Sequence, residues 1–152
     1  MRCGGGHAGD DLTATLRGDI VDNNEILQDR YAASSGDAAL AAEMEALGSD
    51  YHANGYMTRA QADEIGDDLG VGPGQLLLDV GSGCGWPGLY LAERHGCSVV
   101  SLDPVAEGCS VADLRSTADG LSQRSWSIQA SADAIPIRSR CVDGIVQGDV
   151  LC

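Results

Sequence analysis

Lysine is absent from this chain of 152 residues, so its nine strong cations are all arginines. They stand against 23 aspartates and glutamates, which gives a formal net charge of −14 at pH 7. A surface with this excess of negative charge repels the phosphates of nucleic acids and the headgroups of anionic membranes. We therefore expect neither a nucleic-acid partner nor a membrane partner.

The six cysteines include no C-x-x-C pair, and none of them is spaced from a histidine as zinc ligands are. The sequence therefore indicates neither a metal site nor a disulfide framework. It also lacks an apolar run of the roughly 18 residues that a membrane span needs, and its amino terminus has no apolar signal segment. These absences favour a soluble, reduced protein of the cytoplasm, and the length suits one domain.

The most informative stretch is a short apolar run followed by a glycine-rich turn. Leu76 to Val80 has the composition of a central parallel strand that helices cover on both faces, with Asp79 as its one acid. Because a buried carboxylate without a partner is costly, we expect Asp79 to meet a cation or several donors. It lies at the carboxyl end of the strand, where open α/β sheets bind ligands. Glycines at alternate positions of the turn allow the backbone to approach a ligand closely; they are Gly81, Gly83 and Gly85.

Spacing separates the two classes of cofactor that such a turn binds. The dinucleotide fingerprint G-x-G-x-x-G, begun at Gly81, requires a glycine where this chain has Trp86. The residues from Asp79 to Gly85 instead read acid-x-G-x-G-x-G. This pattern resembles motif I of the class I S-adenosylmethionine-dependent methyltransferases, which share the Rossmann-like sheet. A strand-to-helix connection that binds no ligand is the alternative interpretation of the turn alone.

A second acid ends the next expected strand, which covers 97–103. Asp103 lies 20 residues beyond Gly83 and, in a parallel sheet, beside the glycine turn. A carboxylate in this position can accept hydrogen bonds from both hydroxyls of a ribose, a contact worth about 1.5–3 kcal/mol. NAD enzymes also have an acid here, so Asp103 predicts adenosine binding, and Trp86 decides between the cofactors.

Residues 131–137, which follow an expected strand at 125–130, extend the resemblance. They are similar to a family segment in which an alanine-aspartate pair precedes an apolar residue, a proline and a second apolar residue. The resemblance implies that Ala132 and Asp133 meet the adenine, and that Asp79 pairs with the methionine ammonium directly or through water. The full set of expected cofactor-binding residues is Asp79, Gly81, Ser82, Gly83, Gly85, Asp103, Ala132, Asp133 and Gln147.

Gln147 belongs to this set because it ends the fourth expected strand, at 144–147, where it can meet the methionine end of the cofactor. The domain of the family continues well beyond that strand. The resemblance therefore implies that the chain is truncated, and it leaves room for a companion chain or an oligomer to complete the sheet. It identifies no catalytic residue.

We expect 1–50 to form a lead-in and helices, and 51–152 to form the amino-terminal half of a methyltransferase cofactor-binding domain. By the resemblance, Tyr56 and Arg59 lie where the chain of the family folds over the methionine carboxylate. Capping patterns and stop signals predict helices at 26–31, 37–47, 58–69, 88–95 and 104–121.

Together these patterns predict an α/β fold: a Rossmann-like, doubly wound parallel sheet of the methyltransferase type, incomplete at its carboxyl end, with N-terminal helices. The resemblance implies S-adenosylmethionine as the cofactor and methyl transfer to a small-molecule acceptor. The alternatives are an NAD(P)-type Rossmann oxidoreductase, which Trp86 disfavours, and a non-catalytic adenosylmethionine-binding protein or an inactive fragment.

Overall fold

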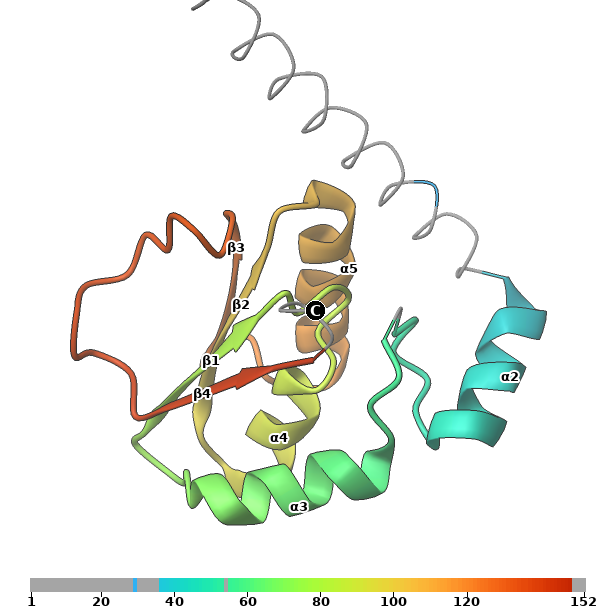
Figure 1. Cartoon of the computed structure of the whole chain (residues 1–152), viewed down its shortest axis with the longest axis horizontal. Helices are drawn as coiled ribbons and strands as arrows, with labels where there is room; N and C mark the ends of the chain where they lie inside the picture. The colour runs from blue at the N-terminus through green and yellow to red at the C-terminus, as the bar shows by residue number, and fades with distance from the viewer. Residues whose placement is uncertain (1–28, 30–35, 54, 149–152) are drawn as a thin grey trace, which may run out of the picture.

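The computed structural model describes residues 29, 36–53 and 55–148 (Figure 1). The lead-in and most of the helix expected at 26–31 lie outside the described residues. In chain order the elements are α2 (Asp37–Leu47), α3 (Arg59–Leu69), β1 (Leu76–Val80), α4 (Gly88–His95), β2 (Ser98–Asp103), α5 (Ala106–Ala118), β3 (Ser125–Gln129) and β4 (Gly144–Gln147).

The four strands are all parallel and form one sheet in the order β3-β2-β1-β4. β1 lies inside this sheet, where Leu78 is level with Val100 of β2 on one side and with Ile145 of β4 on the other. The carboxyl ends of parallel strands meet at one edge, which we call the carboxyl edge. The predicted α/β fold with a Rossmann-like parallel sheet is confirmed.

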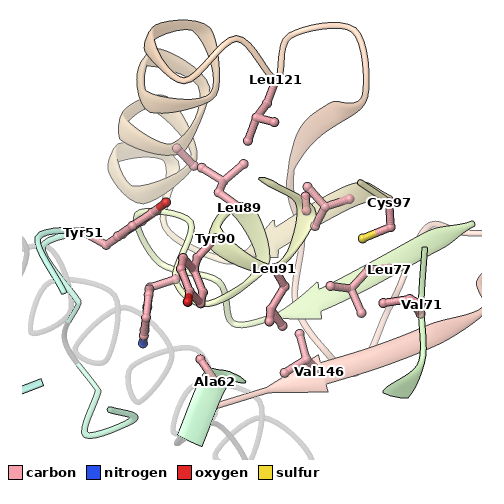
Figure 2. Close-up of a cluster of buried hydrophobic side chains, with 14 residues drawn as sticks. Tyr51, Ala62, Val71, Leu77, Leu89, Tyr90, Leu91, Cys97, Leu121 and Val146 are labelled. Carbon is pink, nitrogen blue, oxygen red and sulfur yellow. The ribbon is translucent and has the colours of Figure 1, made fainter. Parts of the chain in front are cut away.

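Helices α4 and α5 pack on one face of the sheet, and α3 packs against α4 (Figure 1). Crossovers between parallel strands are nearly always right-handed, and the steps from β1 to β2 and from β2 to β3 run in the same direction across the sheet. Both helices therefore fall on the same face. The core between the layers includes Leu77, Val99, Leu89 and Leu91, which are fully buried (Figure 2). Each such side chain stabilises the packing by about 1.5–3 kcal/mol.

The opposite face of the sheet carries no helix within the described residues. A second cluster lies there around Leu78 and Leu102, and irregular chain between β3 and β4 covers part of it through Ile137. On the same face, Trp126 of β3 is 50% exposed and Ile145 of β4 is 57% exposed. The expectation that helices cover β1 on both faces is therefore wrong for this part of the chain, because the connection from β3 to β4 forms no helix.

Local capping explains where the helices begin and end. The hydroxyl of Thr58 accepts the N–H of Gln61, whose side chain accepts the N–H of Thr58, so the predicted capping box is present at the start of α3. The helix expected at 104–121 is shorter, because α5 begins at Ala106. Residue 105 stays extended, with its N–H bound to the carboxylate at the end of β2.

Three observations bear on thiols, metals and membranes. The described residues include four cysteines, all of them free thiols. Within the same residues, no group of three or more histidine, cysteine, aspartate or glutamate side chains is arranged to hold a metal ion. None of the described helices has both the length and the apolar character required to span a membrane.

Candidate functional site at the carboxyl edge

The turn after β1 folds back onto the carboxyl end of β2. Gly81 and Ser82 both donate their backbone N–H to the carbonyl of Leu102, at 2.7 and 3.1 Å. Gly81, Gly83 and Gly85 have φ angles of +71°, +52° and +102°, a range that other residues rarely adopt. The backbone path of the turn itself therefore requires these glycines.

Asp103 joins the end of β2 to this turn. One carboxylate oxygen accepts the backbone N–H of Gly83 at 2.8 Å, and the other accepts that of Val105 at 2.9 Å. Asp103 is buried, and a carboxylate offers about four acceptor positions in all. The structure thus brings Asp103 and the glycine turn together, as the sequence predicted. The ribose contact itself stays a prediction.

Asp79 is fully buried beneath the start of α4. Its Oδ2 accepts the N–H of Gly88 at 2.8 Å, and its Oδ1 has no hydrogen-bond partner within the described residues. The described part of the chain therefore gives Asp79 one donor and no cation, and its expected pairing with the methionine ammonium stays a prediction. Burial raises the pKa of the Asp79 carboxyl from 3.8 to about 8, the Gly88 amide opposes this, and Asp103 adds to it.

Gly88 is a residue of the site that the sequence patterns did not single out. A Cβ at this position would lie 2.5 Å from Oδ2 of Asp79 and 2.7 Å from its Cβ. The amide of residue 88 can therefore reach the carboxylate only because the residue is glycine. The signal in the sequence was a glycine at the first position of a helix, where its low helix propensity calls for a packing reason.

The two residues of the turn that are not glycine, Ser82 and Cys84, point their side chains into the protein. Ser82 and Cys84 are both buried, and the Ser82 hydroxyl has no hydrogen-bond partner among the described residues. Burial raises the pKa of the Cys84 thiol to about 12, so the reactive thiolate is scarce near neutral pH. A ligand above the turn would meet its backbone before it meets these side chains.

Ala132, Asp133 and Gln147 belong to the segments at the carboxyl ends of β3 and β4. The end of β3 is tied to β2, because the N–H of Ala130 donates to the carbonyl of Asp103 at 3.0 Å. Ala132, Asp133 and Gln147 are all exposed. They lie on the expected edge, but nothing brings Ala132 or Asp133 into hydrogen-bond contact with the glycine turn in the described part of the chain. Their roles toward adenine and methionine stay predictions.

Residues 49–53 and 55–57, which we call the roof segment, lie against the glycine turn. The ring of Tyr51 packs on that of Trp86 with 5.2 Å between centroids, and the indole N–H of Trp86 donates to the carbonyl of Met57 at 3.1 Å. Met57 also reaches the end of β4, because a Cβ on Gly148 would lie 3.3 Å from its Cε. None of these residues was among the expected binding residues. The signals in the sequence were Trp86, an aromatic residue directly after the glycine-rich motif, and the tyrosines of the loop that precedes α3.

The contacts of Tyr56 and Arg59 with the methionine carboxylate, which the resemblance implied, stay predictions. Tyr56 is 82% exposed. Arg59 donates its Nε–H to the hydroxyl of Tyr90 at 3.3 Å, and its Cζ lies 4.9 Å from the centre of that ring. Because the guanidinium stacks on an aromatic ring of α4, the arrangement does not support a contact of Arg59 with the methionine carboxylate.

The residues at the carboxyl edge fit the cofactor that the resemblance implies. Asp79 keeps one buried oxygen that has no partner among the described residues, and the Asp103 carboxylate lies beside a turn whose path requires glycines. Trp86 is buried where a dinucleotide turn needs its third glycine. The same edge is thus better suited to an adenosine ligand without a pyrophosphate.

Residues 78–152 match the family described as a methyltransferase domain. A search of curated proteins found no match. Among solved structures, a geranyl diphosphate methyltransferase in complex with GPP and sinefungin is 26% identical, with 76% of this chain and 40% of that chain covered and a TM-score of 0.58.

Two further solved structures have the same fold. A geranyl diphosphate C-methyltransferase from Streptomyces coelicolor A3(2), in complex with Mg2+, geranyl diphosphate and S-adenosyl-L-homocysteine, is 23% identical over 60% of this chain and 34% of that chain, with a TM-score of 0.56. A SAM-dependent methyltransferase from Thiobacillus denitrificans, in complex with S-adenosyl-L-homocysteine, is 24% identical over 59% and 36%, with a TM-score of 0.53. The chain therefore covers between 34% and 40% of these three structures.

Proposed function

We propose that this chain, whose residues 78–152 match the methyltransferase domain family, binds S-adenosylmethionine at its carboxyl edge and is part of an enzyme that methylates a small molecule. The observation that carries the proposal is the hydrogen bond from the Gly83 N–H to Asp103 at 2.8 Å. It places a carboxylate beside a turn whose glycines leave the backbone open to a ligand, which is the arrangement an adenosine needs.

Within this site the cofactor would supply a methyl group already activated on a sulfonium, so the protein contributes mainly position and alignment. Such orientation can contribute about 7–11 kcal/mol to the lowering of a barrier. In our proposal Asp103 accepts hydrogen bonds from the ribose, and Ala132 and Asp133 hold the adenine. Gln147 meets the methionine end, and the backbone of the glycine turn permits close approach; its residues are Gly81, Ser82, Gly83 and Gly85.

Asp79 is proposed to pair with the methionine ammonium, directly or through water. Its buried Oδ1 is an acceptor without a partner among the described residues. Because burial raises the pKa of this carboxyl, the site would have to lose a proton there to gain the ionic contact. A positive group nearby favours that loss, so cofactor binding and deprotonation of Asp79 would support each other.

The acceptor is proposed to be a small molecule rather than a nucleic acid. The net charge of −14 opposes binding of a polyanion. Two of the similar structures are described as geranyl diphosphate methyltransferases, and their named substrate is a small molecule. We also propose a cytoplasmic location, which the free thiols of the described cysteines support, because structural disulfides form in oxidising compartments.

A companion chain or an oligomer that completes the sheet also stays part of this proposal. The support is β4, which is an edge strand of the described sheet and can pair with a further strand, together with the adjoining apolar face on which Trp126 and Ile145 are 50% and 57% exposed. The test is the mass of the chain in solution together with the binding of a hydrophobic fluorescent dye. A monomer that binds no dye would contradict the proposal.

Calorimetric titration separates the proposed function from its alternatives. S-adenosyl-L-homocysteine is expected to bind more tightly than NAD, because Trp86 replaces the third glycine of the dinucleotide turn. A preference for NAD would favour a Rossmann oxidoreductase instead. If S-adenosyl-L-homocysteine binds but the whole protein transfers no methyl group to any member of a broad acceptor panel, the non-catalytic binding protein is the better interpretation. An inactive fragment would bind neither ligand.

The variant Asp103→Asn is expected to weaken S-adenosyl-L-homocysteine binding by about 1.5–3 kcal/mol, the scale of a hydrogen bond to a charged group. Asparagine has one acceptor oxygen for the two N–H groups of Gly83 and Val105, so urea unfolding of the variant is measured as well, to separate a lost ligand contact from a displaced turn. The matched control is Asp113→Asn, which makes the same charge change on the exposed side of α5. If the two variants bind S-adenosyl-L-homocysteine with equal affinity, Asp103 does not contact the ligand.

A further inference from the structure

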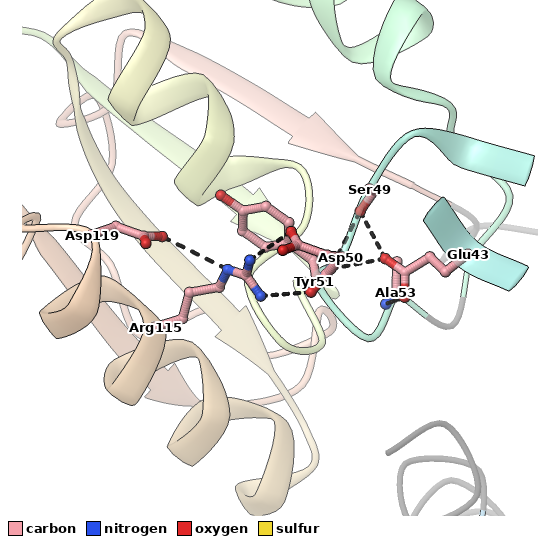
Figure 3. Close-up of polar contacts among 7 residues, drawn as sticks. All are labelled: Glu43, Ser49, Asp50, Tyr51, Ala53, Arg115 and Asp119. Carbon is pink, nitrogen blue, oxygen red and sulfur yellow. Dashed lines mark hydrogen bonds and ion pairs between the residues drawn. The ribbon is translucent and has the colours of Figure 1, made fainter. Parts of the chain in front are cut away.

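The roof segment is fastened at one end by Glu43 of α2 (Figure 3). The Oε1 atom of this side chain accepts the hydroxyl of Ser49 at 2.7 Å and the N–H of Tyr51 at 2.8 Å, and Oε2 accepts the N–H of Ala53 at 3.1 Å. One carboxylate therefore fixes three successive parts of the segment. Because two of the three contacts are to backbone N–H groups, they set the path of the chain itself.

Arg115 of α5 holds the same segment from the other side (Figure 3). Its two terminal nitrogens donate to the carbonyl of Asp50 at 2.7 Å and to its Oδ1 at 2.6 Å. Its Cζ lies 3.7 Å from the centre of the Tyr51 ring, so the guanidinium stacks on the aromatic face as well. Asp119 lies 3.7 Å from Nε. Only a planar fork can make the paired hydrogen bonds and the stacking contact together.

Tyr51 connects Arg115 to the residues beside the glycine turn. Its ring packs on Trp86, which in turn packs on Tyr90 with 5.4 Å between centroids. Trp86 also donates to the carbonyl of Met57, so both ends of the roof segment contact the same indole. A shift of Tyr51 would therefore also displace Trp86, the residue that directly follows the glycine-rich motif.

There is room for such a shift. A cavity of about 240 Å³ lies beside Arg115 and is lined by Tyr51, Arg59, Trp86 and Tyr90, among others. An aromatic side chain in a close-packed interior is held by its neighbours on all sides. Tyr51 is buried but lines this cavity on one side, so the contacts of its ring with Arg115 and Trp86 hold it in place.

We infer that Arg115 is a positioning residue for the cofactor site: through Asp50 and Tyr51 it holds the roof segment against Trp86 and so fixes the turn and the cover of the carboxyl edge. This rests on the proposed function. An ion pair of this kind with an exposed acid adds little to global stability. The expected effect of removing Arg115 therefore falls on the site more than on the fold.

The test compares Arg115→Ala and Arg115→Lys with Asp119→Asn, which removes the other carboxylate near Arg115 and leaves Asp50 and Tyr51 in place. The first readout needs no ligand. It is the hydrogen-exchange rate of the Trp86 indole N–H, with the half-exposed Trp126 indole in the same spectrum as the internal reference. The second is the affinity for S-adenosyl-L-homocysteine, and the third is the free energy of unfolding.

Arg115→Ala is expected to speed exchange of the Trp86 indole by about tenfold or more and to weaken the ligand by about tenfold, since it removes two charge-assisted hydrogen bonds. Arg115→Lys should restore little of either, because an ammonium lacks the planar fork. Asp119→Asn should behave like the wild type in both readouts.

Unchanged exchange at Trp86 in Arg115→Ala would overturn the inference, and so would a full rescue by lysine. A loss of affinity that only follows a fall in global stability would reduce Arg115 to a structural role and overturn it as well. If the wild type binds no S-adenosyl-L-homocysteine, the proposed function fails. The exchange of the Trp86 indole still decides in that case whether Arg115 holds the roof segment.

Discussion

Above pH 8, Asp79→Asn is expected to be several kcal/mol more stable than the wild type, whereas below about pH 4 the two should differ little. Burial raises the pKa of the Asp79 carboxyl to about 8, against 3.8 for the ordinary group. The native state therefore keeps a proton that the unfolded chain has already lost over this interval. The stability linked to this group is complete below about pH 4 and is lost as the pH rises through about 8.

The change in the free energy of unfolding with pH makes this prediction measurable. Each pH unit between the two pKa values should lower the free energy of unfolding of the wild type by about 1.4 kcal/mol relative to the variant. Asparagine keeps an oxygen that can accept the N–H of Gly88, and it does not titrate. Urea unfolding of both proteins at pH 5, 7 and 9 gives the comparison, with Asp113→Asn as the control for a lost surface charge. Parallel curves for the wild type and Asp79→Asn would mean that the carboxyl is ionised in the folded protein.

The second large effect is expected at the glycine turn, where Gly85→Ala should cost about 2–5 kcal/mol, from overpacking and from a left-handed backbone together. The new Cβ would lie 2.9 Å from Cγ of Leu89 and closer still to its Cδ1, and Leu89 is fully buried. The backbone at Gly85 also has φ of +102°. The added methyl group therefore meets both a steric and a conformational penalty.

Gly70→Ala is the matched control for this experiment. Its φ is +62°, and nothing lies within 4 Å of the Cβ that it would gain. Only the conformational penalty of about 1–2 kcal/mol applies there. Chemical unfolding gives both losses, and titration with S-adenosyl-L-homocysteine shows which variant also loses the ligand. Similar losses in the two variants would show that Leu89 and its neighbours yield to the new methyl group.

Local patterns predicted most of the elements, because each begins and ends at a short-range signal. β1 and β4 have the expected bounds, since each is a run with apolar residues between turn residues. α2 also matches its expected range, because Gly48 ends it in the left-handed conformation. The helix expected at 104–121 was too long, since no local pattern shows that the Asp103 carboxylate holds the Val105 N–H.

The site was predicted where chemistry and spacing alone decide it, and it was missed where distant segments meet. Asp103 and Gly83 are joined as the 20-residue spacing suggested. The one-donor environment of Asp79 was not foreseen, because it depends on how closely α4 approaches β1. The contact of Arg115 with Asp50 was invisible for the same reason: the two residues are 65 positions apart, and a single sequence carries no record of that proximity.

The strand order has a consequence for the sequence of folding events. Leu77 of β1 pairs with Val99 of β2 after one helix, whereas its partner in β4, Gly144, lies far along the chain. Closing the longer loop costs more chain entropy, so the β1-α4-β2-α5-β3 unit should assemble first and β4 should join afterwards. During synthesis the amino-terminal part emerges earlier as well. The glycine turn and Asp103 would then meet before the strand that carries Gln147 has docked.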